Sequence, residues 1–285
     1  MTDKDLNVLL SVPNISGNEW KYVKECLETG WISYAGSYVD KFENMVANYA
    51  GSKYGIATMN GTAALHISLL LLGVKKNDYV IVSNLTFVAS ANAIIYSGAD
   101  PILIDADSQT WQMDLDLLEE FLSEKTEINK IGERVLKSDG RCIRTIMPVH
   151  IQGNIFDLNR FEKICDRYQV SFLEDAAEAL GSKFDGKSAG TFGKLGVFSF
   201  NGNKIISTGG GGVIVTDDHS LAKKAKHLTT TAKVDPMYYY HDQVGYNYRL
   251  VNVLAAIGVA QMEQLSSFVI KKNKISEYYK KNLNK

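Results

Sequence analysis

The sequence predicts an α/β fold in which a mostly parallel central sheet is flanked by helices. From Gly55 onward, short apolar runs of strand length alternate with longer stretches whose apolar residues recur at helical spacing. The connections between these runs are short, and such alternation is typical of parallel sheets that are covered by helices. Ligands of these sheets bind at the carboxyl ends of the strands.

Before the alternating part, the pattern predicts a helix at 17–29, a loop at 31–36 and a helix at about 38–49, and Trp20, Val23 and Leu27 form the apolar stripe of the first helix. Strands are predicted at 55–59, 79–83, 101–105, 143–149, 170–173, 195–200 and 212–216. Helices are predicted at 62–72, 87–97, 115–122, 158–168, 251–266 and 271–285. The charged segment 124–142 is predicted to be an exposed excursion.

The composition is that of an ordinary globular protein, with 285 residues, 45% apolar residues and a formal net charge of -1. It has no basic excess that would suggest nucleic acid, and no apolar run long enough for a membrane span or a signal peptide. Cys26, Cys142 and Cys165 form no CxxC pair, so we expect no disulfide framework and a cytoplasmic location. The five histidines lack metal-ligand spacing, so no metal site is predicted.

One lysine stands in an unusual setting. Lys204 lies in FSFNGNKIISTGGGG (198–212), between a short apolar strand and four consecutive glycines. Glycine allows backbone to approach a ligand closely, so this lysine is suited to forming a Schiff base. The alternative is a surface lysine beside a turn, which is the commoner situation for a lone lysine.

Two further segments follow predicted strands. Gly61, Thr62 and Ala63 come after Asn60 and open a helix, where free backbone N–H groups and the helix dipole favour an anion. The alternative is a plain Asn-Gly turn with a threonine N-cap. Phe87 follows the next strand and could stack on a planar ring, although taken alone it could equally be a core phenylalanine.

A pair of carboxylates follows the strand at 170–173. Glu174 and Asp175 alternate in direction while the chain is extended, so only one of them can face the ligand edge of the sheet. Asp175 could hold a protonated pyridine nitrogen through a charge-assisted hydrogen bond. The alternative is that Asp175 caps a helix that begins with AAEAL.

The segment GSKFDGKS (181–188) fits the phosphate-loop pattern of nucleotide hydrolases. That motif needs a strand directly before it and a helix directly after it. Here an alanine-rich turn precedes it, and AGTFG, which is poor helix material, follows it. Nucleotide hydrolysis is therefore the less favoured alternative.

Together and in this order, the motifs resemble the pyridoxal-phosphate-dependent sugar aminotransferases of the DegT/DnrJ/EryC1/StrS group. The matching words are GTAALH, TFVASANAI, PVHIQGNIFDL, EDAAEALGS, FSFNGNK, TGGGG and GYNYRLVNVLAAIGVAQMEQL, and they extend from about residue 12 to 270. VPNISGNEWKYVKECLETGW and FNGNKIISTGGGG look most like the subgroup that makes 4-amino sugars for legionaminic acid and related bacterial glycans. The resemblance implies transferase fold type I, similar to the large domain of aspartate aminotransferase.

The resemblance also implies a cofactor, pyridoxal 5'-phosphate, and a role for each matching residue. Lys204 would bind the cofactor covalently and move the proton, and Asp175 would pair with the pyridine nitrogen. The phosphate would be held by Gly61, Thr62, Ala63 and Ser199. Phe87 and Glu178 would contact the ring. Asn247 would reach the phosphate that is bound in the neighbouring subunit. The active site would then be shared in a homodimer, with the 31–36 loop nearby.

The implied reaction is transamination of a nucleotide-linked 4-keto-6-deoxy sugar, of UDP-N-acetylhexosamine type, with glutamate as amino donor, for bacterial surface glycan synthesis. Related sugar dehydratases carry histidine in place of Lys204, which favours amino transfer. Residues 1–250 would form the cofactor-binding large domain, and 251–285 a helical segment that leads to a small C-terminal domain absent from this sequence. This absence leaves open a catalytically weak cofactor-binding remnant or dimerisation partner.

Overall fold

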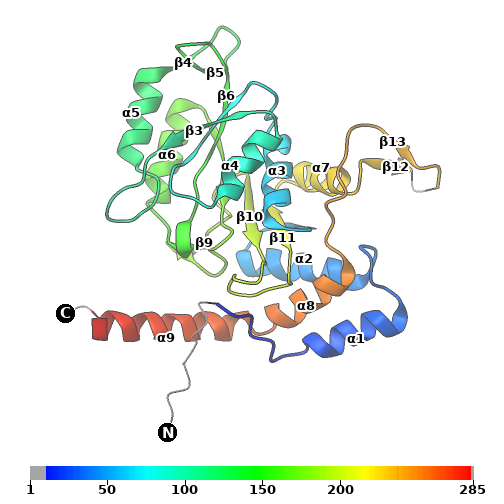
Figure 1. Cartoon of the computed structure of the whole chain (residues 1–285). Coiled ribbons are helices and arrows are strands. Elements are labelled where there is room, and N and C mark those ends of the chain that lie inside the picture. The colour runs from blue at the N-terminus through cyan, green and yellow to red at the C-terminus, as the bar shows by residue number, and fades with distance from the viewer. Residues whose placement is uncertain (1–10, 236, 284–285) are drawn as a thin grey trace, which may run out of the picture.

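The computed structural model describes residues 11–235 and 237–283. The first ten residues of the predicted large domain and the last two of the predicted terminal helix lie outside the described residues. A seven-stranded sheet in the order β1-β11-β10-β7-β6-β2-β3 forms the centre (Figure 1). Its strands are β1 (Tyr54–Thr58), β2 (Tyr79–Ser83), β3 (Asp100–Ile104), β6 (Ile143–Met147), β7 (Ser171–Asp175), β10 (Leu195–Ser199) and β11 (Gly212–Thr216).

The sheet is mostly parallel, as predicted. Strand β11 pairs antiparallel with both β1 and β10, whereas the other pairs in the sheet are parallel. The helices are α1 (Glu19–Thr29), α2 (Ser37–Ala50), α3 (Gly61–Leu71), α4 (Val88–Tyr96), α5 (Leu115–Lys125), α6 (Leu158–Tyr168), α7 (His219–Thr229), α8 (Asn252–Met262) and α9 (Leu265–Leu283). A short 3-10 turn, η1, spans Ile151–Gly153.

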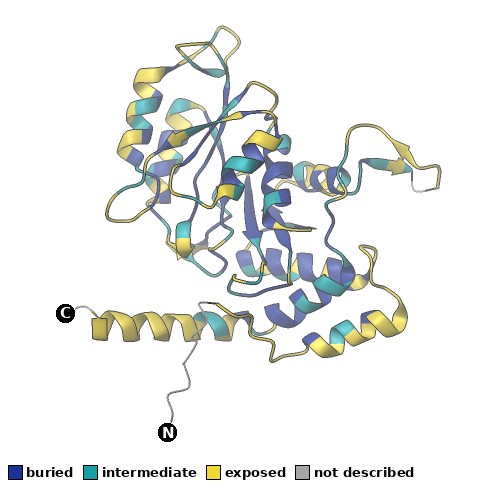
Figure 2. Cartoon of the chain, viewed as in Figure 1, coloured by how far each residue is buried: buried dark blue, intermediate teal, exposed yellow. Residues whose placement is uncertain are grey.

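Both faces of the sheet are buried, because the strand side chains alternate between two layers of helices (Figure 2). In β10, Leu195 and Val197 join the core under α3, α4 and α7, while Phe198 joins the core under α2 and α8. Helices α5 and α6 cover the remaining part of that second face. The carboxyl ends of the parallel strands are thereby left free at one edge.

Two segments differ from the sequence prediction. The 124–142 excursion contains a hairpin of β4 (Thr126–Ile128) and β5 (Arg134–Leu136). Helix α7 was not predicted, although Asp218 caps it by accepting hydrogen bonds from the backbone N–H groups of its first turn. Its buried apolar residues are Ala222, Ala225 and Leu228, with Leu221 partly buried beside them, and they alternate with lysines, so the helical period is weak in the sequence.

The prediction that Trp20, Val23 and Leu27 form the buried side of α1 was wrong. Trp20 is 79% exposed and Leu27 is also exposed, while Cys26 is the buried apolar residue of the helix. Helix α8 packs on α1 and α2 of its own chain, and its small residues Ala255, Ala256, Gly258 and Ala260 are buried there.

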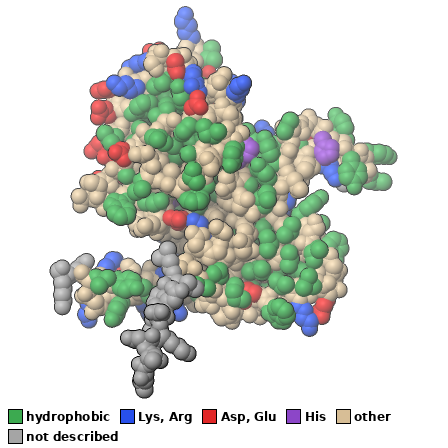
Figure 3. Space-filling view, in the orientation of Figure 1, with side chains coloured by type: hydrophobic (Ala, Val, Ile, Leu, Met, Phe, Trp, Pro, Cys, Tyr) green, Lys and Arg blue, Asp and Glu red, His purple; other side chains and the backbone are tan. Residues whose placement is uncertain are grey.

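The predicted helix at 251–266 ends at Met262, and α9 begins at Leu265 and extends away with mostly exposed residues (Figure 2). The domain division at residue 250 stays a prediction. Among the described residues no single helix has the length and apolarity of a membrane span. Helices α8 and α9 have that length and apolarity only when taken together, and they are bent by 57° relative to each other. Acidic and basic side chains are interspersed on the face that Figure 3 shows.

A buried ion pair joins distant parts of the chain. Arg249 lies beside β1, where it donates to Glu43 of α2 at 2.7 Å and to the carbonyl of Ala57 at 3.1 Å. Glu43 also accepts the backbone N–H of Ala57 at 2.8 Å and an ammonium hydrogen of Lys226 at 3.2 Å. Both members of the Arg249–Glu43 pair are buried, so removing Arg249 leaves the Glu43 carboxylate without its buried cation.

We expect Arg249→Met to lower the free energy of unfolding by about 3 kcal/mol, because it removes the buried partner of the buried Glu43 carboxylate and leaves only the half-exposed Lys226 as its cation. Lys226→Met is the matched control: Lys226 binds the same carboxylate, but half of its side chain is exposed, so it should cost less than about 1 kcal/mol. Urea denaturation measures both. Equal losses for the two variants would contradict the assignment.

Candidate active site

The sheet brings the predicted site segments to one edge. Asp175 is the last residue of β7 and Ser199 the last of β10, so both lie at the carboxyl ends of parallel strands. Strand β1 ends at Thr58 and continues into the first turn of α3, and β2 leads into Phe87 at the start of α4. The predicted binding edge therefore exists.

Asp175 is only 4% exposed. Its carboxylate accepts a hydrogen bond from Ser90 Oγ at 2.7 Å and one from the backbone N–H of Ala177 at 3.2 Å. Burial raises the pKa of Asp175, and the two hydrogen bonds together with nearby His150 and Lys204 oppose that rise. Within the described residues no lysine, arginine or histidine forms an ion pair with it. A cation at this edge of the sheet would therefore be strongly favoured.

Glu174 points the other way. Its carboxylate accepts three backbone N–H groups of the turn at 190–193, at 2.6 to 2.8 Å, and it contacts His150 Nε2 at 2.8 Å. Glu174 therefore holds the turn at 190–193, and of the two adjacent acids only Asp175 stays a candidate for the predicted ligand contact. No helix follows Asp175, so the alternative of a helix-capping aspartate was wrong.

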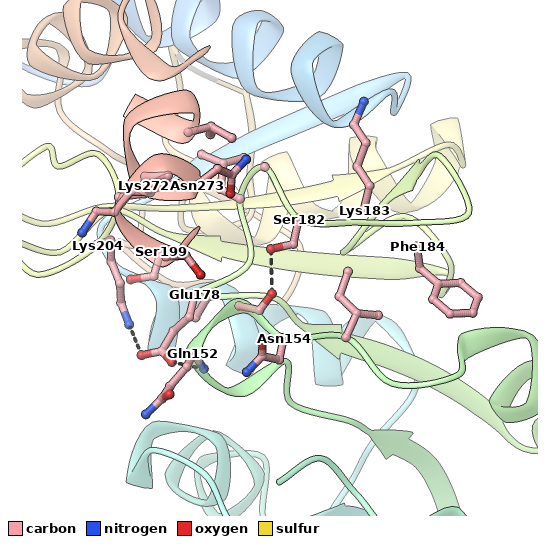
Figure 4. Close-up of a pocket in the computed structure, with 18 of the residues that line it drawn as sticks. Gln152, Asn154, Glu178, Ser182, Lys183, Phe184, Ser199, Lys204, Lys272 and Asn273 are labelled. Carbon is pink, nitrogen blue, oxygen red and sulfur yellow. Dashed lines mark hydrogen bonds and ion pairs between the residues drawn. The ribbon is translucent and has the colours of Figure 1, made fainter. Parts of the chain in front are cut away.

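Lys204 lies in the turn after β10. Its Nζ donates to Glu178 Oε1 at 3.0 Å, and its side chain is 13% exposed (Figure 4). The other carboxylate oxygen of Glu178 accepts the backbone N–H of Gln152 at 2.7 Å. Lys204 is thus a partly buried lysine in a turn that faces a fixed carboxylate, and its role as the cofactor lysine stays a prediction.

The last of the four glycines after Lys204 approaches the chain's own backbone. A Cβ on Gly212 would lie 2.6 Å from the carbonyl oxygen of Asn60 and 2.8 Å from the nitrogen of Gly61. This close approach allows β11 to pair with β1 up to the Thr58–Gly212 position. Next to Gly209 there is open space, so a close approach of a ligand to that part of the turn stays a prediction.

The first turn of α3 and Ser199 lie together. A Cβ on Gly61 would be 3.0 Å from Ser199 Cβ and 3.1 Å from its Oγ. Asn60 caps the helix by accepting the N–H of Ala63 at 2.8 Å, which leaves the N–H groups of Gly61 and Thr62 without an intrahelical acceptor. The capping residue is Asn60, so the alternative of a threonine N-cap was wrong.

Phe87 and Asn247 are both exposed. Phe87 is the N-cap residue of α4 and is 70% exposed, so it is not a core phenylalanine. Asn247 forms an isolated bridge with Thr230 after α7, and no hydrogen bond of the described residues connects its side chain to Lys204 or Asp175. The single chain brings the other predicted site residues to one edge of the sheet but gives Asn247 no contact with them.

A cleft of about 820 Å³ adjoins this group. One wall carries Ser199, Lys204 and Glu178, and the loops at 152–155 and 180–184 form another (Figure 4). Helix α9 contributes Lys272 and Asn273. The sequence prediction included neither these α9 residues nor Gln152 and Ser90, because the fold alone brings them to the site. Within the described residues no cluster of three or more His, Cys, Asp or Glu could hold a metal ion.

The segment at 181–188 is not a phosphate loop. It contains a hairpin of β8 (Lys183–Phe184) and β9 (Lys187–Ser188) that turns through Asp185 and Gly186, both with positive φ. No helix begins at its Lys-Ser pair. The structure therefore contradicts the context that the nucleotide hydrolase alternative requires. Elsewhere, β12 (Lys233–Asp235) and β13 (Tyr240–His241) form another small hairpin.

Comparison with known sequences gives consistent matches. The family model described as "DegT/DnrJ/EryC1/StrS aminotransferase family" matches residues 13–285. The chain is 42% identical over 272 residues to GDP-perosamine synthase of Escherichia coli O157:H7, covering 95% of this chain and 70% of that protein. It is 40% identical over 273 residues to the putative pyridoxal phosphate-dependent aminotransferase EpsN of Bacillus subtilis, covering 96% and 68%.

Solved structures match the fold. Spr1654 of Streptococcus pneumoniae, a putative sugar aminotransferase in its PMP-form, superimposes with a TM-score of 0.87 at 24% identity, covering 98% of this chain and 71% of that chain. Helicobacter pylori PseC, an aminotransferase involved in the biosynthesis of pseudoaminic acid, gives a TM-score of 0.78 at 26% identity, covering 90% and 66%. These neighbours confirm the predicted transferase architecture.

Proposed function

The chain belongs to the DegT/DnrJ/EryC1/StrS family of pyridoxal-phosphate-dependent aminotransferases, and from that premise we propose that it aminates a nucleotide-linked 4-keto-6-deoxy sugar. The observation that carries the proposal is the buried Asp175 carboxylate, which has no cationic partner among the described residues and lies at the same sheet edge as Lys204. A protonated pyridine nitrogen is a cation of the required kind.

The residues present fit the cofactor. Asp175 would accept the hydrogen bond of the ring nitrogen, and Lys204 Nζ would hold the cofactor covalently. The uncapped N–H groups of Gly61 and Thr62, with Ser199 beside them, suit a phosphate dianion at a helix N-terminus. The exposed ring of Phe87 is available for stacking, and Ala63 contributes to the same helix turn.

When bound, pyridoxal phosphate supplies an electron sink for the carbon that bears the amino group. The protein's own contribution is to hold charges and to move one proton. Asp175, as a carboxylate, would favour the protonated form of the ring nitrogen. In the structure Lys204 Nζ donates to Glu178 Oε1 at 3.0 Å, which fixes its position. As a neutral amine, Lys204 would accept and return the proton as general base.

The substrate follows from the relatives' names as a proposal. GDP-perosamine synthase of E. coli favours a GDP-linked sugar, while the legionaminic-type subgroup and a UDP-N-acetylhexosamine stay predictions from the sequence motifs. Glutamate is the proposed amino donor, and bacterial surface glycan synthesis is the proposed context.

An assay with UDP-, GDP- and dTDP-linked 4-keto sugars and glutamate tests this function. We expect one nucleotide to give 4-amino sugar and 2-oxoglutarate at an ordinary enzymatic rate of roughly 1–1000 per second. The Lys204→Ala variant sets the background. If the native protein binds pyridoxal phosphate but converts no member of the panel, it is the cofactor-binding remnant or dimerisation partner instead.

We also propose a homodimer whose site is completed by Asn247 of the second subunit. Asn247 is exposed on the segment after α7, and the small residues of α8, the helix that follows it, are buried in their own chain. The partner surface must then lie elsewhere, and the 31–36 loop, with exposed Trp31 and Ile32, is available.

Asn247→Ala should weaken dimerisation in the presence of pyridoxal phosphate, because a ligand that binds only the dimer stabilises it by mass action. We expect about a tenfold loss of cofactor affinity, the value of one hydrogen bond to a charged group. Sedimentation at decreasing concentration, with and without cofactor, measures the linkage, and Gln243→Ala is the control at an exposed position four residues earlier. A native monomer that binds cofactor as tightly as the dimer would contradict the shared site.

A further inference from the structure

Ser90 is a buried hydroxyl in the first turn of α4. It is 1% exposed, and its Oγ donates to Asp175 Oδ2 at 2.7 Å. The other carboxylate oxygen has only the longer contact with the N–H of Ala177, at 3.2 Å. Ser90 is therefore the shortest hydrogen-bond partner of the buried acid, although 85 residues separate the two in the chain.

A second hydroxyl continues this contact toward the surface. Thr86 Oγ1 lies 2.8 Å from Ser90 Oγ and 3.2 Å from the carbonyl oxygen of Phe87. An ionised carboxylate only accepts, so the single hydroxyl hydrogen of Ser90 is used on Asp175, and Ser90 Oγ is left to accept. The single hydroxyl hydrogen of Thr86 has two acceptors within reach, Ser90 Oγ at 2.8 Å and the carbonyl oxygen of Phe87 at 3.2 Å. Donation along the shorter contact gives a directed chain, Thr86 to Ser90 to Asp175.

We propose that Thr86 and Ser90 are positioning residues that fix the orientation of the Asp175 carboxylate and keep it ionised, so that it can hold a cationic ring nitrogen. The proposal rests on the proposed function in assigning the cofactor to Asp175. Donors to the charged form of an acid favour that form, and successive hydrogen bonds strengthen one another. Phe87 is the N-cap residue of the same helix, α4. The start of α4 would therefore supply both the ring that stacks on the cofactor and the hydroxyl that binds Asp175.

The charge of Asp175 depends on a small set of neighbours. Burial raises its pKa, and the groups that oppose the rise are Ser90, the N–H of Ala177, His150 from the end of β6 and Lys204 from the turn after β10. Removing the Ser90 hydroxyl takes away the first of these and leaves the others in place. The expected change is a further upward shift of the Asp175 pKa.

The test compares Ser90→Ala, Thr86→Val and Ser90→Thr with Ser97→Ala. Ser97 is the matched control, because it is a buried serine at the end of the same helix whose Oγ donates only to the carbonyl of Ala93. The Asp175 carboxyl is followed by carbon-13 NMR across a pH series in the protein without cofactor, and is assigned by its loss in Asp175→Asn. Cofactor affinity is then measured by absorbance titration without substrate.

We expect Ser90→Ala to raise the pKa of Asp175 and to weaken pyridoxal phosphate binding roughly tenfold or more, with Thr86→Val shifting both in the same direction by less. Ser90→Thr should restore native values, and Ser97→Ala should leave them unchanged. The proposal would be overturned if the pKa of Asp175 were unchanged in both Thr86→Val and Ser90→Ala. It would also be overturned if Ser90→Ala bound pyridoxal phosphate as tightly as the native protein, or if Ser97→Ala shifted the pKa of Asp175 as much as Ser90→Ala.

Thr86 is only partly buried, so Thr86→Val decides the matter even if Ser90→Ala fails to fold. The proposed function and the proposal on Thr86 and Ser90 would be refuted by different results. A native protein that does not bind pyridoxal phosphate would refute the proposed function, whereas the titration of Asp175 without cofactor still tests the hydroxyl chain.

Discussion

Replacing Lys204 by alanine is expected to abolish transamination and covalent attachment of the cofactor while leaving the fold intact. The side chain supplies both the amine that binds the cofactor and the base that moves the proton, and a positioned general base alone contributes roughly 100- to 10,000-fold. Its contact in the structure is Glu178, which keeps the backbone N–H of Gln152 when the lysine is removed. The loss should therefore be catalytic rather than structural.

Borohydride reduction followed by peptide mapping measures the attachment. The native protein should be yellow, and reduction should fix the cofactor on one peptide that contains Lys204. Lys187→Ala and Lys194→Ala are controls, since both lysines are exposed in neighbouring segments and should leave the label unchanged. Label found on Lys187 or Lys194 would show that the assignment is wrong.

Asp175→Asn should sharply lower transamination with little change in the fold. An amide has the shape of the carboxylate and can still accept the Ser90 hydroxyl, but it carries no charge to hold a protonated ring nitrogen. A hydrogen bond to a charged group is worth about 1.5–3 kcal/mol in the ground state, and the loss in kcat/KM should exceed the corresponding factor.

Glu174→Gln is the control for Asp175→Asn, because the adjacent acid is buried but bound to the backbone of the turn at 190–193. Its replacement should lower the melting temperature and leave the cofactor's absorption spectrum unchanged. Steady-state kinetics, absorption spectra and thermal unfolding of the two variants separate the roles. Near-native kcat/KM in Asp175→Asn would mean that another acid faces the ring.

The repeating features of the fold could be predicted from the sequence because they are local. Continuous apolar runs of strand length, as in β10 and β11, and the helical period of α6 are visible in the pattern of apolar residues. Helix α7 and the β4–β5 hairpin were missed, because polar and charged residues interrupt their short apolar patterns and only a few side chains reach the core. The stripe of α1 was misread because Trp20 is exposed and Cys26 buried.

The sequence by itself determined the family motifs and, from them, which residues we propose for the chemistry: a lysine after one strand, an acid after another and a helix start suited to an anion. Only the tertiary structure decided which way each of these side chains points. Strand alternation allows one of Glu174 and Asp175 at the ligand edge, and the choice depends on the turn at 190–193, whose N–H groups need an acceptor. Likewise Ser90 reaches Asp175 only because parallel strands bring α4 and the end of β7 to the same edge.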